Sequence, residues 1–324
     1  MAPPTITLEE HYLSKTLRKR MADSRQQDPY KLLPASLIDT PSSLGADRVA
    51  DLDASQVALQ ILSHSPIEAS AEQCRAENAE LAQAIKGQPR YAAFALLSMA
   101  SPAAAAEELE RCVKEHNFVG ALINNHCGGT FYDSESFRPV FAKADELDVP
   151  IYIHPTFAAD EWMPHYSGDY GEKAAQIMSS TAWGWHSETG LYVLRLWASG
   201  LFDAFPKLKI IIGHMGEMLS FQLDRIISAS SFWRVENKRG LEQVWKENFW
   251  VTTSGMFTLA PFSCLLKMCA KDRILYLVDY PFSGNDTGLK FIEEIEASGM
   301  MDKEELEMFC YKNAEKVLKI KLPQ

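Results

Sequence analysis

The chain has 324 residues, of which 47% are hydrophobic and 23% charged, which is typical of a soluble globular protein large enough to bury a sizeable core. Its formal net charge of -11 at pH 7 argues against binding to nucleic acid or to anionic membrane surfaces. The first residues lack a secretory signal, no apolar run is long enough to span a bilayer, and the six cysteines form no close pair. We therefore expect a cytosolic protein with free thiols.

Eight short apolar segments recur along the chain, and most are followed by a stretch with helical periodicity. Several are continuously apolar, as expected for strands buried on both faces. Strands that alternate with helices predict parallel βαβ units, and eight such units predict a closed (β/α)8 barrel of the TIM type, an α/β fold in a single domain over residues 1–324. The expected strands are Thr5–Leu8, Gln56–Leu62, Ala92–Leu97, Gly120–Ile123, Pro150–Ile153, Lys209–Ile212, Phe249–Thr253 and Ile274–Val278.

Two stretches depart from this alternation. Residues 21–46, rich in Pro, Ser, Gln and Asp, are interpreted as an insertion after the first strand that can fold over the barrel mouth. Residues 155–181, rich in Gly, Asp and Tyr, are predicted to form a long loop after the fifth strand. Loops on the C-terminal side of barrel strands tend to carry function.

Metal-binding residue types stand at the ends of three expected strands. The carboxyl ends of barrel strands meet at one mouth, so residues far apart in sequence converge there. Glu9 and His11 are two apart on an extended strand and point the same way, whereas Glu10 points the other way. With His154 and Asp279 they offer two imidazoles and two carboxylates, which suit one ion such as Zn2+ or Mn2+. The alternative is that each residue is satisfied separately in the core or at the surface.

A second group follows the sixth expected strand. His214 and Glu217 are three apart, so they can face each other on a first helical turn, where the carboxylate would set the tautomer of the imidazole. We interpret the pair as supporting or acid–base residues; the alternative is a helix-capping histidine beside a glutamate that suits the helix dipole. Arg225 would fall on the same helical face, where it can bind a substrate carboxylate, or it is a surface arginine.

The number of metal ions can be addressed from what the chain lacks. Binuclear hydrolases on this barrel commonly carry His-x-His on the first strand and a metal-bridging lysine at the end of the fourth. This chain has Glu9-x-His11 instead, and Asn-Asn-His follows Ile123 where the lysine would stand. The sequence therefore favours one metal ion over two.

Aromatic residues follow the long loop. Trp183, Trp185 and His186 lie near the expected mouth and can stack on an aromatic ring. Packing alone is the more frequent role of such residues. No P-loop, dinucleotide-binding glycine pattern or nucleophile elbow is present in the sequence, so nucleotide-binding and serine-hydrolase functions lack support.

Four motifs, in this order and spacing, resemble the amidohydrolase-2 family. That family includes 2,3-dihydroxybenzoate, γ-resorcylate, salicylate and 5-carboxyvanillate decarboxylases and is related to the ACMSD group. With further matching stretches, the likeness covers nearly the whole chain. The motifs are LEEH at Leu8–His11, IYIHP at Ile151–Pro155, GHMGE at Gly213–Glu217 and VDYPF at Val278–Phe282.

The resemblance implies a reaction and a set of roles. The reaction is the non-oxidative decarboxylation of an ortho-hydroxy aromatic acid, with Asp279 delivering a proton to the ring carbon, in a homodimer or homotetramer. The residues that match His214, Glu217 and Arg225 contact or support the substrate. A single Mn2+, Zn2+ or Mg2+ is implied at the residues that match Glu9, His11, His154 and Asp279.

Two other functions stay open at this point. A mononuclear metal-dependent hydrolase of a lactone, ester or amide would use the same ligands to activate water, and a barrel without activity would serve as a binding scaffold. An aromatic mouth containing Trp185 and Phe282, together with Arg225, favours a planar anionic ring as the ligand. The complete ligand set argues against the scaffold. The loops after the fourth and fifth strands match the characterised decarboxylases less well, which leaves the exact substrate open.

Overall fold

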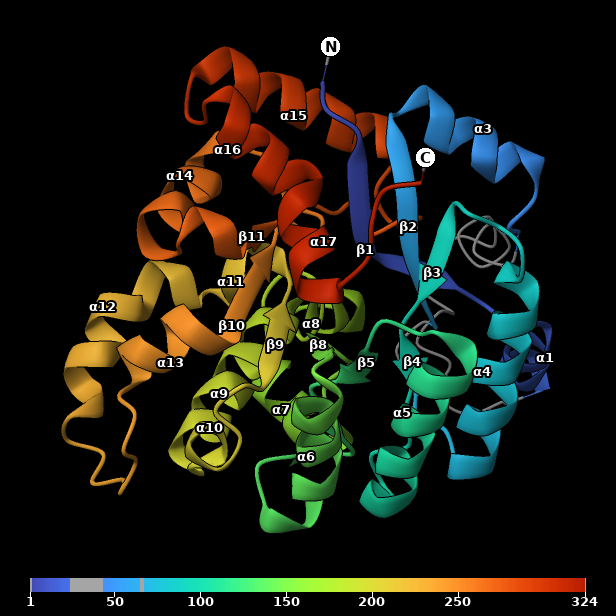
Figure 1. The fold of residues 1–324 in the computed structure, drawn as a ribbon. Helices are drawn as coiled ribbons and strands as arrows, with labels where there is room; N and C mark the ends of the chain where they lie inside the picture. The colour runs from blue at the N-terminus through green and yellow to red at the C-terminus, as the bar shows by residue number, and fades with distance from the viewer. Residues whose placement is uncertain (1, 24–42, 65–66, 324) are drawn as a thin grey trace.

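The structure is a computed structural model that describes residues 2–23, 43–64 and 67–323. Parallel strands follow one another in chain order around a central ring, and helices cover its outside (Figure 1). The predicted (β/α)8 barrel is therefore confirmed. The strands that form the ring are β1 (Thr5–Tyr12), β2 (Val57–His64), β3 (Tyr91–Ala93) with β4 (Ala95–Leu96), β5 (Ala121–Asn124), β8 (Pro150–His154), β9 (Lys209–Ile212), β10 (Phe249–Thr252) and β11 (Ile274–Leu275).

The ring consists of two hydrogen-bonded sheets that meet at two places. One sheet has the order β1-β2-β3, and the other runs from β4 to β11. Phe94 separates β3 from β4, so both sheets share one interrupted strand. At the other seam, the backbone N–H of His11 donates to the carbonyl of Tyr280 at 2.8 Å. This second contact brings the end of β1 beside the segment that follows β11, where Asp279 lies.

The strand bounds differ from the predicted ones mainly at the two ends of the ring. Strand β1 continues past the predicted Leu8 to Tyr12, whereas β11 ends at Leu275 rather than at Val278. The two short antiparallel strands β6 (His126–Cys127) and β7 (Thr130–Phe131) form a hairpin after β5. Glycines 128 and 129, both with positive φ, make its turn.

The helices of the described residues cover the outside of the ring and its loops. Helix α5 begins at Pro102, a residue favoured in a first helical turn, and the Ser101 side chain before it makes no capping hydrogen bond. The helices are α1 (Lys15–Asp23), α3 (Ala46–Ala54), α4 (Ala71–Ile85), α5 (Pro102–His116), α6 (Arg138–Leu147), α7 (Met163–Tyr166), α8 (Glu172–Met178), α9 (Gly184–Ala198), α10 (Leu201–Ala204), α11 (His214–Glu217), α12 (Leu219–Ser230), α13 (Leu241–Asn248), α14 (Leu259–Met268), α15 (Asn285–Ser298), α16 (Lys303–Glu307) and α17 (Asn313–Leu318), with a π-helical turn at Met308–Lys312.

The two unusual stretches have different outcomes. Most of the predicted insertion 21–46 lies outside the described residues, between the end of α1 and the start of α3. The predicted loop 155–181 is not a simple loop, because it contains α7 and α8. Tyr166 anchors it by donating from its hydroxyl to Glu188 of α9 at 2.9 Å. This segment therefore packs against the start of α9, where Trp185 and His186 lie.

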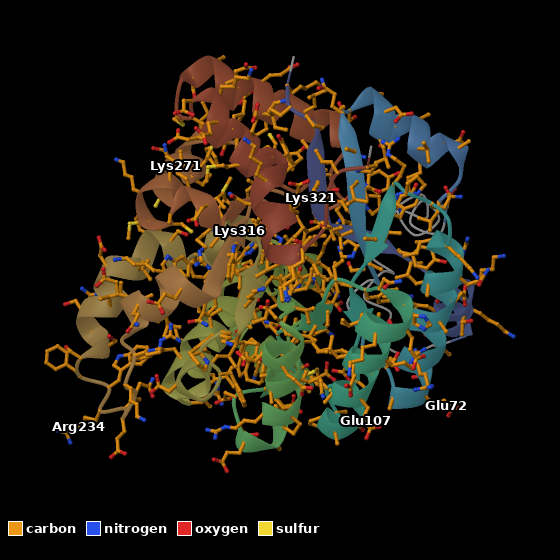
Figure 2. The ribbon with its side chains drawn as sticks, in the orientation of Figure 1. Glu72, Glu107, Arg234, Lys271, Lys316 and Lys321 are labelled. Carbon is orange, nitrogen blue, oxygen red and sulfur yellow. The ribbon has the colours of Figure 1, made fainter. Side chains whose placement is uncertain are left out.

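The barrel has two hydrophobic cores. Inside the ring, the inward side chains of alternate strand residues, such as Leu8, Tyr152, Trp250 and Leu275, pack with the buried side of α17, which closes one end. A second core lies between the strands and the outer helices. Charged side chains such as Glu72 and Arg234 point away from both at the periphery (Figure 2).

Two further features bear on the sequence-based expectations. All six cysteines are free thiols, as the sequence predicted. Among the described residues, the helices are all too short or too polar to cross a lipid bilayer.

Candidate metal centre and active site

Four ligand-type side chains converge at the carboxyl end of the ring. The structure brings together Glu9, His11, His154 and Asp279, with one ligand atom from each lying within 4.8 Å of the other three. His11 Nε2 lies 3.1 Å from Asp279 Oδ1, and His154 Nε2 lies 2.8 Å from Glu9 Oε1. The side chain of Glu9 is fully buried, whereas that of Asp279 is 14% exposed. Asp279 is therefore the most accessible member of the cluster.

A β-bulge in β1 aims two of these side chains into the barrel. Thr7 pairs with Gln60 and Glu10 pairs with Leu62, so β1 carries one more residue than β2 between these pairs. Such a bulge switches the face on which the following side chains lie. As a result Leu8 packs in the barrel interior, and Glu9 points inward as well, while Glu10 points out to the Gln60 side chain at 3.0 Å.

Simple alternation places the other two ligands. Tyr152 faces the barrel interior, so His154, two residues later in β8, lies on the same side. Leu275 and Leu277 also face the interior, and Asp279 follows in the same phase. Asp279 has a φ of 68°, so the chain turns at this residue as it leaves the barrel wall.

The hydrogen bonds around Glu9 and His154 leave two acceptors facing each other. His154 Nδ1 donates to the Pro155 carbonyl at 2.5 Å, so the lone pair of this imidazole is on Nε2. Glu9 Oε2 accepts from the hydroxyls of Tyr152 and, at 2.7 Å, Ser254, while its buried Oε1 has no hydrogen bond. A lone pair and a carboxylate oxygen 2.8 Å apart repel each other unless a cation lies between them, so the residues fit a metal ion.

Electrostatics favour the forms that bind metal at two of the ligands. Burial and the neighbouring His154 lower the pKa of His11 to about 3, which leaves this imidazole neutral at pH 7. Burial alone would raise the pKa of Glu9, but its interactions with the imidazoles of His154, His214 and His11 outweigh burial and hold the pKa below its ordinary value. Neutral imidazole and ionised carboxylate are the ligand forms required.

Asp279 has the opposite tendency. Burial, followed by the negative charges of Glu9, Glu10 and Glu217, raises its pKa well above the ordinary value. A carboxyl group in such surroundings takes up a proton more readily than an ordinary aspartate does. It can therefore act as an acid as well as a ligand.

A second cluster lies beside the first. Glu217 is 1% exposed, and its two carboxylate oxygens contact two imidazoles: Oε1 lies 2.7 Å from His214 Nδ1 and Oε2 lies 2.8 Å from His186 Nδ1. His214 Nε2 lies 3.3 Å from the hydroxyl oxygen of Ser254, which itself donates to Glu9. Ser254 thus connects the two clusters.

The turn that carries His214 and Glu217 is not the predicted first helical turn. His214, Met215, Gly216, Glu217 and Met218 all have positive φ, and regular helix α12 begins only at Leu219. The contact between the two side chains was expected, but the helical explanation for it is wrong, because a left-handed turn brings them together. The same turn separates Glu217 from α12, so it shares no continuous helical face with Arg225.

The remaining predicted site residues are divided between the mouth and the surface. The ring centroids of Phe282 and His11 lie 5.2 Å apart, and those of Trp185 and His154 lie 6.3 Å apart. Trp183 is 53% exposed. Arg225 is exposed on α12 and makes no hydrogen bond or ion pair within the described part of the chain.

Three residues with a place in the site escaped the sequence analysis or were given a minor role. Tyr152 and Ser254 hold Glu9, and His186 holds Glu217. The available signal was their phase: Tyr152 is two residues before His154, and Ser254 follows β10 in the phase of Trp250. The partner of His186 is 31 residues away, and nothing local indicates it.

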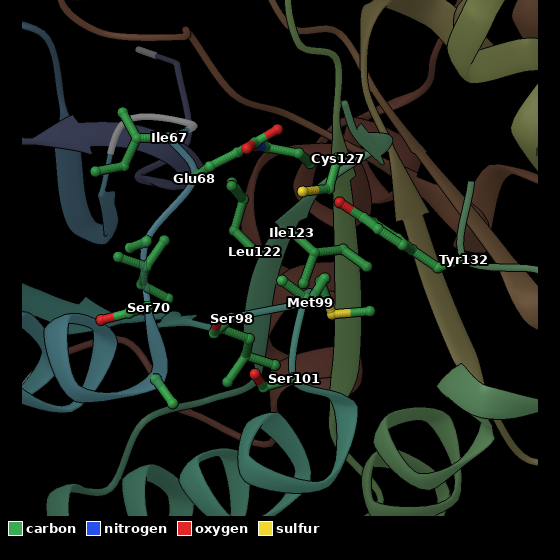
Figure 3. A pocket seen from close by; sticks show the side chains of 16 residues that line it. Ile67, Glu68, Ser70, Ser98, Met99, Ser101, Leu122, Ile123, Cys127 and Tyr132 are labelled. Carbon is green, nitrogen blue, oxygen red and sulfur yellow. The ribbon is translucent and has the colours of Figure 1, made fainter. Parts of the chain in front are cut away.

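A separate pocket of about 370 Å³ lies between the loops that follow β2, β4 and β5. Glu68, Ser98, Cys127 and Tyr132 are among the residues that line it (Figure 3). Glu68 accepts from the backbone N–H of Gly128 at 2.9 Å. None of the residues that line this pocket belongs to the two clusters, so it is not the space beside Asp279.

Comparison with known proteins gives a consistent result. The model of a family described as Amidohydrolase matches residues 34–320. A protein named Decarboxylase orsB from Emericella nidulans is 44% identical over 99% of this chain and 98% of its own length. A gamma-resorcylate decarboxylase from Polaromonas sp. is 34% identical over 90% of this chain and 93% of its own.

Solved structures of similar fold over nearly the whole chain are also decarboxylases. A 2,6-dihydroxybenzoate decarboxylase in complex with 2,6-dihydroxybenzoate has a TM-score of 0.86 at 30% identity and covers 98% of this chain and 100% of its own. A dihydroxybenzoic acid decarboxylase from Polaromonas sp. with bound manganese and the inhibitor 2-nitroresorcinol has a TM-score of 0.84 at 31% identity, covering 98% of this chain and 97% of its own.

Proposed function

This chain belongs to the amidohydrolase family, and from that premise we propose that it is a metal-dependent carboxy-lyase that removes the carboxyl group of an ortho-hydroxy aromatic acid. The cluster of Glu9, His11, His154 and Asp279 carries this proposal, because it offers a complete set of ligands at the barrel mouth. The relatives that cover most of the chain support the reaction class by their names, and the complex with 2,6-dihydroxybenzoate supports the substrate class.

The donor set fits one divalent ion, and we propose Mn2+ or Zn2+, with Mg2+ as a weaker match to two imidazoles. Manganese is the ion in the Polaromonas structure. A bound ion would supply Lewis acidity that fixes and polarises the substrate carboxylate and its ortho-hydroxyl. Tyr152 and Ser254 contribute by holding one oxygen of Glu9, so that the other oxygen stays aimed at the ion.

The aromatic ring of the substrate would lie between the side chains that flank the cluster. Phe282 and Trp185 approach His11 and His154 from the mouth and offer edges and faces for ring contacts. Holding a planar ring there presents the carbon that bears the carboxylate to Asp279. Arg225 stays a prediction as a ligand of the substrate carboxylate, since it is exposed on α12.

Asp279 is proposed as the proton donor. Its side chain is the most exposed of the four ligands, which places it on the substrate side of the cluster. It would transfer its proton to the ring carbon bearing the carboxylate, which interrupts aromaticity. The bond from that carbon to the carboxylate then breaks, its electron pair restores the aromatic ring, and carbon dioxide leaves. The Asp279 carboxylate must then regain a proton from solvent.

The second cluster would hold His214 in place during this step. The Glu217 carboxylate accepts a hydrogen bond from the Nδ1–H group of His214. This hydrogen bond directs His214 Nε2 toward Ser254 and the metal side of the site. His214 can then donate to or accept from an oxygen of the substrate. Glu217 is proposed to act through His214, since its carboxylate oxygens are both engaged.

Assembly into a homodimer or homotetramer is also proposed. Large apolar side chains on and after α12 support it, since Phe221 is 81% and Phe232 is 82% exposed, which is costly in a free monomer. Light scattering after gel filtration measures the mass directly. A mass equal to a single chain of 36.4 kDa would contradict this part of the proposal.

The activity itself is tested by measuring carbon dioxide release from a panel of benzoic acids with and without an ortho-hydroxyl group, using protein loaded with Mn2+ or Zn2+. We expect release only from the ortho-hydroxy acids. No release from any acid, together with hydrolysis of a lactone, ester or amide, would overturn the proposal in favour of a hydrolase.

A further inference from the structure

The Glu217 carboxylate is buried between two imidazoles, only one of which the reaction described above uses. A carboxylate that is 1% exposed needs a compensating charge as well as hydrogen bonds, because an unpaired buried charge is very costly. His214 reaches one oxygen and His186 the other. The compensating positive charge must therefore lie on His214 or on His186.

His186 has a hydrogen-bond acceptor beside each of its two ring nitrogens. Its Nδ1 lies 2.8 Å from Glu217 Oε2, and its Nε2 lies 3.1 Å from the carbonyl oxygen of Thr181. A carboxylate oxygen and a carbonyl oxygen can only accept hydrogen bonds, and a neutral imidazole has only one N–H. Both contacts are satisfied as hydrogen bonds only when both ring nitrogens carry a proton.

The charges around His186 agree with this. Glu217 and His214 face it from α11, and Glu9 adds negative charge from β1. Burial lowers the pKa of His186, but the hydrogen bond and charge of Glu217 and the Thr181 carbonyl outweigh burial and raise it overall. The ring is also 18% exposed, so a proton can reach it from solvent.

We propose that His186 is a positioning residue of the decarboxylation reaction: as an imidazolium held between Glu217 and the Thr181 carbonyl, it fixes the second oxygen of Glu217 and so holds His214 at the edge of the metal cluster. The inference rests on the proposed function and adds a residue to it. With the charge of Glu217 balanced by His186, His214 has only to donate one hydrogen bond, and its Nε2 stays available on the substrate side.

The start of α9 packs closely against the turn that precedes it. His186 sits in the first turn of α9, whose backbone approaches the preceding turn so closely that a Cβ at Gly184 would lie 2.3 Å from the Ser179 carbonyl oxygen. This close approach places Thr181 and Glu217 on opposite sides of the His186 ring. The site is therefore built from three chain segments rather than from a single chance contact.

The charge of His186 is measured by 15N NMR of protein labelled at its histidines. We expect both ring nitrogens of His186 to give signals of the protonated type at pH 7.5, and the signals to be assigned by their loss in His186→Asn. One unprotonated nitrogen at that pH would overturn the inference. A metal-bound nitrogen, with two ions per chain, would also overturn it, since the three side chains lie close enough to hold an ion.

The role in the reaction is tested with two substitutions. His186→Asn keeps a neutral donor near the position of Nδ1, whereas His186→Ala removes it. We expect kcat per bound metal to fall on the order of tenfold in His186→Asn and further in His186→Ala, with KM changing less, and the pH profile of kcat to shift. His165→Asn, at an exposed histidine of α7, is the matched control and should behave as wild type.

The outcomes separate this inference from the proposed function. Wild-type kcat, KM and pH profile in His186→Asn would overturn the positioning role. If His186→Ala fails to fold, the kinetics of the His186→Asn variant still test the positioning role, and the NMR signals of wild type still test the charge of His186. Wild-type protein that releases no carbon dioxide from any acid would instead overturn the proposed function, while the NMR result would still establish the charge of His186.

Discussion

The Ser254 hydroxyl donates a hydrogen bond to Glu9 Oε2 at 2.7 Å, which joins two residues that are 245 positions apart. The same hydroxyl oxygen lies 3.3 Å from His214 Nε2. Ser254 is fully buried, so no water replaces it easily. One small side chain therefore holds a metal ligand on one side and contacts the second cluster on the other.

Replacing this residue should weaken metal binding. In Ser254→Ala, Glu9 Oε2 keeps only the Tyr152 hydroxyl, and Glu9 is less firmly oriented. We expect the affinity for Mn2+ or Zn2+ to fall about tenfold, which is the usual cost of losing a residue that orients a metal ligand. Titration of metal-free protein by calorimetry measures it, with Ser228→Ala at an exposed position of α12 as the control. Equal affinity in both variants would show that Ser254 does not support the ligand.

Asp279→Asn should separate metal binding from proton transfer. The amide can still offer an oxygen to the metal, but it cannot donate the proton that the ring carbon needs. We expect carbon dioxide release per bound metal to fall about 10³-fold, within the range for loss of a general acid. The rate under single-turnover conditions, normalised to metal content, is the measurement. A variant that keeps its metal and loses less than tenfold in rate would rule out Asp279 as the donor.

Phe282 should contribute to substrate binding rather than to the chemical step. The centroid of its ring lies 5.2 Å from that of the His11 ring, and the residue is 39% exposed. Phe282 can therefore contact a planar ligand above the cluster. In Phe282→Leu we expect KM for an ortho-hydroxy acid to rise about fivefold and kcat to change little, because a ring contact is worth roughly 1 kcal/mol. Steady-state kinetics test this. The reverse pattern, a lower kcat at unchanged KM, would mean that Phe282 positions the reacting groups instead.

A buried carboxylate outside the active site predicts how stability depends on pH. Glu108 of α5 accepts from Arg111 at 2.6 and 2.8 Å and from Asn78 at 2.8 Å. Burial alone would raise its pKa, but these hydrogen bonds outweigh burial and lower it. The stabilisation is complete above the unfolded-state pKa of about 4.3 and is lost as the pH falls through the lower pKa of the folded protein.

Glu108→Gln tests this relation. At pH 7 we expect the free energy of unfolding to fall by about 2 kcal/mol, since the Arg111 side chain then lacks its carboxylate partner. Below about pH 4 the difference from wild type should shrink, because the wild-type carboxylate becomes protonated. Urea unfolding at several pH values measures it, with the exposed Glu107→Gln as the control. A difference that grows on acidification would contradict the assignment.

The fold and the convergence of the four ligand-type residues could be read from the sequence because both depend on local patterns. Continuous apolar segments marked the strands, and Asp279 continues the phase of Leu275 and Leu277. The bulge in β1 could not be read in this way: strict alternation from Leu8 would have put Glu10 into the barrel. Only the spacing of Glu9 and His11 as metal-type residues indicated the correct side.

The second cluster could be predicted from the sequence only in part. The pairing of His214 with Glu217 follows from their spacing, but five consecutive positive φ values are a property of the packed structure and not of this sequence pattern. His186 meets Glu217 only through the packing of α9 against α11, across 31 residues. Contacts of this kind depend on tertiary structure and leave no periodicity to detect.

The most direct test of the central claim is to titrate metal-free protein with Mn2+ or Zn2+ while following carbon dioxide release from 2,6-dihydroxybenzoate and other ortho-hydroxy acids. The structure predicts that activity is absent without metal and reaches its maximum at about one ion per chain, and that His154→Ala neither binds that ion tightly nor regains activity. Activity that persists without metal, that requires two ions per chain, or that survives in His154→Ala would contradict a mononuclear centre at Glu9, His11, His154 and Asp279.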